Sequence, residues 1–113
     1  MVNEKTIISQ VSSNYGSNIS YNGQLGTKSD SNLYKVGRIC VFSVIFTRTG
    51  TATNSLLATV PASCYPLVRF NLSCDRYGDT TGSECYIGSD GKIIFSNSQT
   101  GDFKISGTWV TAS

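Results

Sequence analysis

The segment 38–47 is apolar on both of the faces that a β-strand would present. It is rich in β-branched and aromatic residues, which favour strands. Alternate side chains of a strand point to opposite sides. One face carries Cys40, Phe42, Val44 and Phe46. The other carries Ile39, Val41 and Ile45, interrupted only by Ser43. A strand of a small antiparallel sandwich usually has one polar face. We therefore expect the second face to be covered, either by the rest of the chain or by another copy of it.

Shorter β-like segments, separated by Gly, Asn, Asp and Ser, recur along the rest of the chain. No long window has apolar residues at helical spacing. We expect strands at 5–11, 33–36, 55–60, 67–74, 84–88, 92–96 and 102–110, and a short strand at 19–21 before an Asn22-Gly23 turn. Within 67–74 the apolar face carries Val68, Phe70, Leu72 and Cys74. The pattern predicts an all-β fold, an antiparallel β-sandwich of the jelly-roll type or a barrel.

Two details refine this assignment. Asp90-Gly91 between the segments 84–88 and 92–96 predicts a hairpin with a type I′ turn, because that turn needs positive φ. Phe103 and Ile105 should point inward from the last strand, with Trp109 near its end. The 113 residues correspond to one domain, 1–113, large enough to bury a core. Residues 1–32, which are mostly polar, are a candidate neck-like or linking segment.

The charge pattern argues against nucleic acid as a partner. Charged residues make up 14% of the chain, the net charge is +2, and the basic residues are scattered. The longest apolar stretch, within 39–46, is far shorter than the roughly 20 residues of a membrane helix. We also expect no secretory signal, because the first residues lead into a strand-like segment and not into an apolar run.

Histidine is absent, which removes the commonest general base and the commonest metal ligand together. We therefore expect no enzyme activity and no cofactor. Asp75, Asp79 and Asp90 fit no EF-hand spacing, so no metal is expected. The small number of acidic residues argues against Glu84 and Asp75 as a glycosidase pair.

The four cysteines, Cys40, Cys64, Cys74 and Cys85, form no Cys-x-x-Cys pair, so a zinc site has little support. Three of them, all except Cys64, lie at apolar positions of expected strands. The favoured interpretation is that they are small buried hydrophobic residues. A Cys74–Cys85 disulfide is the alternative, since these two residues flank one loop.

Four segments carry a family resemblance. They are Lys35-Val36-Gly37-Arg38, Ala58-Thr59-Val60-Pro61-Ala62 with Tyr65-Pro66, Ile87-Gly88-Ser89-Asp90-Gly91-Lys92-Ile93, and Ile105-Ser106-Gly107-Thr108-Trp109. In this order and spacing they resemble the C-terminal head domains of bacteriophage tail-fibre and receptor-binding proteins, and the tips of related bacterial trimeric fibres. The resemblance covers about residues 33–110. One departure is that the family commonly has Gly-Tyr-Arg-Pro where this chain has Ser63-Cys64-Tyr65-Pro66.

The resemblance implies a homotrimer at the tip of a fibre, on a virion tail or alternatively on a bacterial surface. It also implies recognition of a cell-surface receptor, often a glycan, and offers no catalytic residues. The alternative is a structural trimerisation or cap domain that binds nothing.

A glycan site needs aromatic faces for stacking and planar polar groups for paired hydrogen bonds. The expected loop after 67–74 offers both kinds in Asp75, Arg76, Tyr77 and Asp79. Tyr65 and Trp109 are further candidates. For Trp109 the favoured role is packing at the end of the sandwich or contact between subunits, and for Tyr65 it is packing at a corner.

Overall fold

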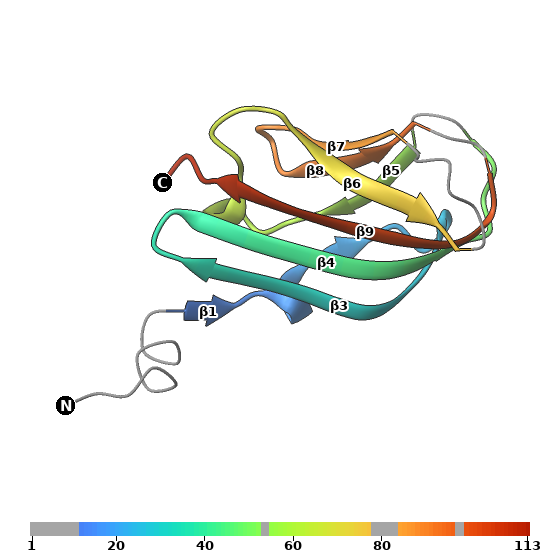
Figure 1. The fold of residues 1–113 in the computed structure, drawn as a ribbon, viewed down its shortest axis with the longest axis horizontal. Coiled ribbons are helices and arrows are strands. Elements are labelled where there is room, and N and C mark those ends of the chain that lie inside the picture. Colours follow the sequence, from blue (N-terminus) through green and yellow to red (C-terminus); the bar gives the residue numbers. More distant parts are fainter. Residues whose placement is uncertain (1–11, 53–54, 78–83, 97–98) are drawn as a thin grey trace.

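The computed structural model describes residues 12–52, 55–77, 84–96 and 99–113, and nine antiparallel strands form within them (Figure 1). The strands are β1 (Ser12–Asn14), β2 (Ser20–Tyr21), β3 (Gly26–Val36), β4 (Ile39–Arg48), β5 (Ser55–Thr59), β6 (Phe70–Arg76), β7 (Cys85–Ile87), β8 (Lys92–Phe95) and β9 (Gly101–Val110). Two 3₁₀ turns, η1 (Gly16–Asn18) and η2 (Ala62–Cys64), connect strands. The predicted all-β class is confirmed.

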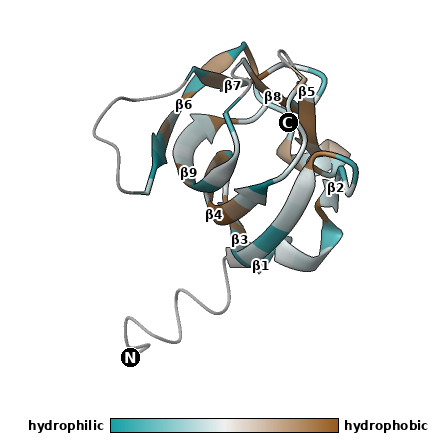
Figure 2. Cartoon of the chain, turned by 90° about the vertical axis from the view of Figure 1, so that its right-hand side faces the viewer, coloured by the Kyte–Doolittle hydropathy of each residue, from teal (hydrophilic) through white to brown (hydrophobic). Residues whose placement is uncertain are grey.

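The strands form a single curled sheet in the order β1-β3-β4-β9-β6-β7-β8-β5-β2. In Figure 2 the strands surround a central core, with β6, β7, β8 and β5 across from β1, β3 and β4. The sheet curls so far that β2, at one edge, contacts β3 near the other. The hydroxyl oxygens of Tyr21 in β2 and Ser31 in β3 lie 2.5 Å apart and share a hydrogen bond. The Tyr21 ring also stacks on Phe46 of β4, and burial raises the pKa of its hydroxyl.

Strand β6 changes its pairing partner along its length. Its first residues pair with β7, and Ser73 and the residues after it pair with β9. At the change of partner, the Leu72 side chain lies over Gly107 of β9. A Cβ at Gly107 would stand 2.4 Å from Leu72 Cδ2, so a larger residue at this crossing would force the Leu72 side chain to move.

The core is built from the inward faces of β4 and β9 and the strands opposite them. Cys40, Phe42, Val44 and Phe46 are all buried, as the alternation in 38–47 predicts. Phe103 and Ile105 are buried as expected, and the Phe103 ring meets Phe95 of β8 edge to face at 4.7 Å. The central strands β4 and β9 pair over ten residues, from Ile39↔Val110 to Arg48↔Gly101.

A buried arginine closes the core at the end of β4. Arg48 is 1% exposed, and its guanidinium lies 4.6 Å from the centroid of the Phe95 ring. Its Nε donates a 2.7 Å hydrogen bond to the Gly50 carbonyl, and Nη2 donates to the Ala52 carbonyl. Burial lowers the pKa of Arg48. The 49–52 segment is therefore held to the sheet by a cation inside the protein.

The largest difference from the sequence prediction is β3, which begins at Gly26 and not at residue 33. Its first half carries polar residues, so apolar alternation did not reveal it. A bulge between Ser29 and Asn32, where Asp30 has φ 50°, lets the strand bend around the core. Residues 12–32 thus contribute β1, β2 and half of β3 to the sheet.

The structure also tests the strand expected at 67–74 and the hairpin expected around Asp90-Gly91. The strand expected at 67–74 begins at Phe70, and Val68 is 68% exposed, so the predicted inward face holds only for Leu72 and Cys74. The hairpin of β7 and β8 is confirmed, but its turn is not type I′. Only Gly91 has positive φ (78°), with hydrogen bonds from Gly91 N to Gly88 O and from Gly88 N to Lys92 O. This is a three-residue loop with a glycine in the left-handed region.

Two other elements complete the comparison. The short strand at 19–21 and the Asn22-Gly23 turn are confirmed by β2 and by a hydrogen bond from Leu25 N to Asn22 O. The strand expected at 5–11 lies outside the described residues. The described part of the chain contains no helix of the length and apolarity needed to cross a membrane.

Candidate functional site

The most distinctive surface of the molecule is a cluster of exposed apolar side chains on the outside of the sheet. We call it the outer apolar face, and it consists of Tyr34, Val36, Ile39, Val41 and Val110, each 40–48% exposed. The register explains the cluster. Tyr34 lies opposite Val41, and Ile39 lies between Val36 and Val110. Side chains at directly paired positions of neighbouring strands touch, so β3, β4 and β9 build one continuous patch.

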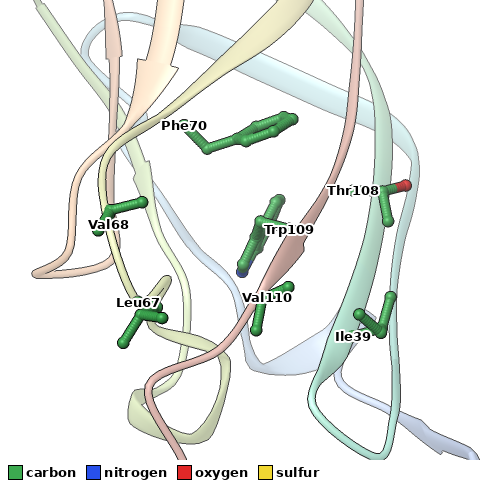
Figure 3. Close-up of a pocket in the computed structure, with 7 residues that line it drawn as sticks. All are labelled: Ile39, Leu67, Val68, Phe70, Thr108, Trp109 and Val110. Atoms are coloured by element: carbon green, nitrogen blue, oxygen red, sulfur yellow. The ribbon is translucent and has the colours of Figure 1, made fainter.

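A pocket adjoins this face where the chain turns into β6 (Figure 3). Its volume is about 360 Å³, and it is lined by Ile39, Leu67, Val68, Phe70, Thr108, Trp109 and Val110. Leu67 and Val68 are 55% and 68% exposed, which is unusual for aliphatic side chains. Thr108 supplies the one polar side chain besides the indole, and no charged residue lines the pocket.

Trp109 forms the buried part of this pocket. It is 3% exposed, its ring lies 6.2 Å from that of Phe42, and its Nε1 donates a 2.8 Å hydrogen bond to the Cys64 carbonyl. The indole N–H is therefore already used inside the protein. The ring supports the pocket from within and presents little of its surface to a ligand.

The charged residues near the outer apolar face are used to hold backbone. Arg38 Nη2 donates to the carbonyls of Thr111 and Ala112, at 2.9 and 3.0 Å. Lys35 Nζ donates to the Ser63 carbonyl at 2.7 Å. These bonds fix the segments on either side of the pocket, so the surface is preformed and uncharged at its centre.

The same sheet face becomes polar toward its other end. A smaller hollow of about 160 Å³ is lined by Asp30, Ser43, Val44, Ile45, Lys104, Ile105 and Ser106. Ser43 is exposed and Ile45 is half-buried, so the exposed apolar residues on the second face of β4 are Ile39 and Val41. The described part of the chain leaves Ile39 and Val41 uncovered, at 41% and 48% exposure.

The predicted binding residues at 75–79 lie at the opposite end of β9 from the pocket. Asp75 pairs with Lys104, and Tyr77 N donates a 2.9 Å hydrogen bond to the Asp102 carbonyl. The Tyr77 ring is 50% exposed, with Lys104 Nζ 5.7 Å from its centroid. Asp79 lies outside the described residues. An aromatic face and charged groups are thus presented together at this end.

Arg76 belongs to the same end, because it pairs with Phe103 at the start of β9. Six residues separate Phe103 from Trp109, which corresponds to roughly 20 Å along a strand. The structure therefore places Asp75, Arg76 and Tyr77 at one end of β9 and Trp109 at the other. Asp75 and Arg76 are consecutive strand residues, so their side chains leave opposite faces of the sheet.

Tyr65 lies on the Trp109 side, in the segment after η2. The Tyr65 carbonyl accepts a 3.0 Å hydrogen bond from Ala112 N. Its half-buried ring covers Gly91, where a Cβ would stand 2.3 Å from Tyr65 Cε1. Tyr65 therefore packs at a corner, next to the β7–β8 turn.

Most of the pocket was not predicted from the sequence. Leu67, Val68 and Phe70 were all assigned to the strand 67–74, with Val68 and Phe70 facing inward. The exposure of Val68 follows from the late start of β6. The signal that did exist was the doubly apolar segment 38–47, which predicted an apolar second face for Ile39 and Val41.

Among the residues that the structure describes, no group of three or more cysteine, aspartate or glutamate side chains is arranged to hold a metal ion. A scan of protein-family models found no match to the chain, and no curated protein sequence is significantly similar to it.

Proposed function

We propose that the chain is the receptor-binding head of a trimeric fibre, at the tip of a phage tail fibre or alternatively on a bacterial surface. In this proposal the outer apolar face joins the three subunits, and the Asp75–Tyr77 end binds a glycan receptor on a cell surface. The protein carries out no chemical reaction in this role. The observation that carries the proposal is the outer apolar face, since monomeric soluble proteins rarely expose large contiguous apolar patches.

The composition of this face supports association with another protein surface. Exposed aliphatic and aromatic side chains without charge are typical of the centre of an interface between subunits. Each of the five residues is about half exposed, and its complete burial would contribute roughly 1 kcal/mol, half the 1.5–3 kcal/mol of a whole side chain. Three identical subunits would each gain this contribution.

The arrangement of the two ends supports a division of labour. Ser12 pairs with Val36 next to the outer apolar face, so the described chain enters the sheet at that end. The β3–β4 turn and the end of β9 lie there too, while β6 ends at the opposite side of Figure 1. Contact between subunits at the first end would leave Tyr77 exposed at the second.

The groups at the second end suit sugar recognition. The Tyr77 ring is half exposed and can stack on the C–H face of a pyranose, and Arg76 and Asp75 can form paired hydrogen bonds to hydroxyls. Weak individual sites are sufficient, because three copies on each fibre and many fibres on each particle raise the apparent affinity.

The experiment compares two double variants in an adsorption assay on host cells or a glycan array. Arg76→Ala/Tyr77→Ala removes the proposed site. The matched control is Arg69→Ala/Tyr86→Ala, which removes the same side-chain types from a stacked pair, 3.5 Å apart, elsewhere on the surface. We expect lost binding for the first and unchanged binding for the second, both with wild-type solution mass.

Two outcomes would contradict this assignment. Equal binding by both variants would place the receptor site elsewhere or favour the alternative of a structural cap domain that binds nothing. A wild-type protein that stays monomeric at all concentrations would remove the trimer. The outer apolar face supports the cap domain equally well, so the binding assay separates the two functions.

A further inference from the structure

We propose that the four buried cysteines are two disulfide sites, Cys40–Cys64 and Cys74–Cys85, which are closed when the protein folds in an oxidising environment. The structure has all four as free thiols, each 4% exposed or less. The proposal rests on the packing of the core and is independent of the proposed function.

The first pair is held together by both strands that flank Cys40. Trp109 of β9 lies opposite Cys40, and its Nε1 hydrogen-bonds the Cys64 carbonyl at 2.8 Å. Lys35 of β3 lies opposite Cys40 on the other side, and its Nζ hydrogen-bonds the carbonyl of Ser63 at 2.7 Å. The η2 turn is thereby fixed over Cys40, and the neighbouring Cys64 thiol contributes to the raised pKa of Cys40.

The second pair lies where β6 changes partner. Cys85 of β7 pairs with Leu72, and Cys74 is two residues further along β6, so it points to the same side. Both side chains are buried in the core at this point, Cys74 at 4% and Cys85 at 2% exposure. The Cys74 thiol also contributes to the raised pKa of Cys85, as expected for two neighbouring thiols.

The topology also excludes a bridge between Cys40 and Cys74. Cys40 lies opposite Trp109 and Cys74 opposite Ile105, on the two sides of β9. Two strand spacings separate them laterally by about 10 Å, and four residues separate them along the strand by about 13 Å. Disulfides need Cα atoms within roughly 7 Å, so Cys40 cannot reach Cys74 in the folded protein.

The oxidant we name is a low-molecular-weight disulfide. One cysteine thiolate attacks a sulfur of the oxidant, which releases one small thiol and leaves a mixed disulfide. The second cysteine thiolate then attacks the protein sulfur of this mixed disulfide and releases the second small thiol. The protein loses two protons and two electrons in each pair, and the oxidant is reduced to two thiols.

Burial of the four thiols determines whether they can react with the oxidant before or after the protein has folded. Desolvation and the Cys64 thiol raise the pKa of Cys40 to about 12, and hydrogen bonding with Cys74 and desolvation raise the pKa of Cys85. Few thiolates exist in the folded protein at neutral pH, and buried thiols are inaccessible to an oxidant. We therefore expect bridging during folding and slow oxidation of the folded, reduced protein.

The test is refolding of the unfolded, reduced full chain in two buffers, one with a mixture of oxidised and reduced glutathione and one with excess reductant. Remaining thiols are then alkylated and the protein is digested with trypsin without reduction. Cleavage after Arg38, Arg48, Arg69, Arg76 and Lys92 places the four cysteines on four separate peptides, 39–48, 49–69, 70–76 and 77–92. Every pairing therefore has its own mass.

We expect cross-linked 39–48 with 49–69, and 70–76 with 77–92, in the glutathione buffer. Each bridge should raise the folding equilibrium constant roughly 30-fold or more over the reduced protein. Four alkylated cysteines in a protein folded by circular dichroism would overturn the proposal, and so would any other pairing. Cys40→Ser/Cys64→Ser should retain the 70–76 to 77–92 cross-link, and its loss from a folded variant would count against independent sites.

Discussion

Replacing Val41 by glutamate tests whether the outer apolar face joins copies of this chain. Val41 is 48% exposed, and its neighbours on the paired strands are Tyr34 and Thr108. In a separate subunit the new carboxylate stays in water, so the cost should not exceed about 1 kcal/mol of strand preference. In an assembly the same carboxylate would be buried in every subunit.

The effect on association can be estimated from the exposures. Each subunit loses roughly 1 kcal/mol of apolar burial at Val41. Bringing like charges together and desolvating them costs several kcal/mol more. A total of at least about 4 kcal/mol corresponds to roughly 1,000-fold weaker association.

The assay is light scattering on a sizing column over a concentration series, with thermal unfolding as the test of folding. Thr27→Glu is the matched control, because Thr27 is an exposed β3 residue outside the apolar patch, paired with Thr47. We expect Val41→Glu to elute as a folded monomer and Thr27→Glu to associate like the wild type. Wild-type association by folded Val41→Glu would refute the reasoning.

Three further predictions concern the core. Gly107→Ala should destabilise the protein by about 1–3 kcal/mol, since its Cβ would stand 2.4 Å from Leu72 Cδ2. Urea unfolding should show a smaller loss of stability when the same change is made in a Leu72→Ala background, and an equal loss would disprove the clash. Arg48→Lys should lower stability by about 2 kcal/mol, because lysine cannot both stack on Phe95 and donate to two carbonyls; unchanged urea unfolding would contradict this. Burial and the neighbouring Cys64 thiol raise the pKa of Cys40 from 9.0 to about 12. As pH rises through this range the unfolded state loses its proton first, so the stability of the reduced protein should fall. Urea unfolding at neutral pH and at about pH 10 measures this fall, and the disulfide-bonded protein, which has no thiol there to titrate, should lack it.

The fold class and most strands were predictable because apolar alternation reports directly on burial. The segment 38–47 predicted the buried face of β4 and the apolar character of its second face, on which Ile39 and Val41 are exposed in the single chain. The first half of β3 was missed because its residues, such as Lys28 and Ser29, are polar on both sides, and only pairing with β4 keeps them extended. Local sequence carries little information about such pairing.

The candidate site was less predictable because it depends on contacts between distant segments. Arg76 and Tyr77 share one end since they are neighbours in the chain. Trp109 was grouped with them by residue type, yet β9 carries it to the other end. The exposure of Val68 depends on where β6 begins pairing, which the regular alternation of 67–74 does not reveal.

The position of β9 has a consequence for how the protein is made. It lies between β4 and β6 at the centre of the sheet, yet it follows the other eight strands in the chain. Until the ribosome has released it, β4 and β6 each have an unpaired edge, and such edges promote aggregation. The sheet cannot be completed during translation of the earlier strands, and pairing so distant in sequence is slow. Newly made chains should therefore depend on dilution or chaperones during the interval before β9 inserts.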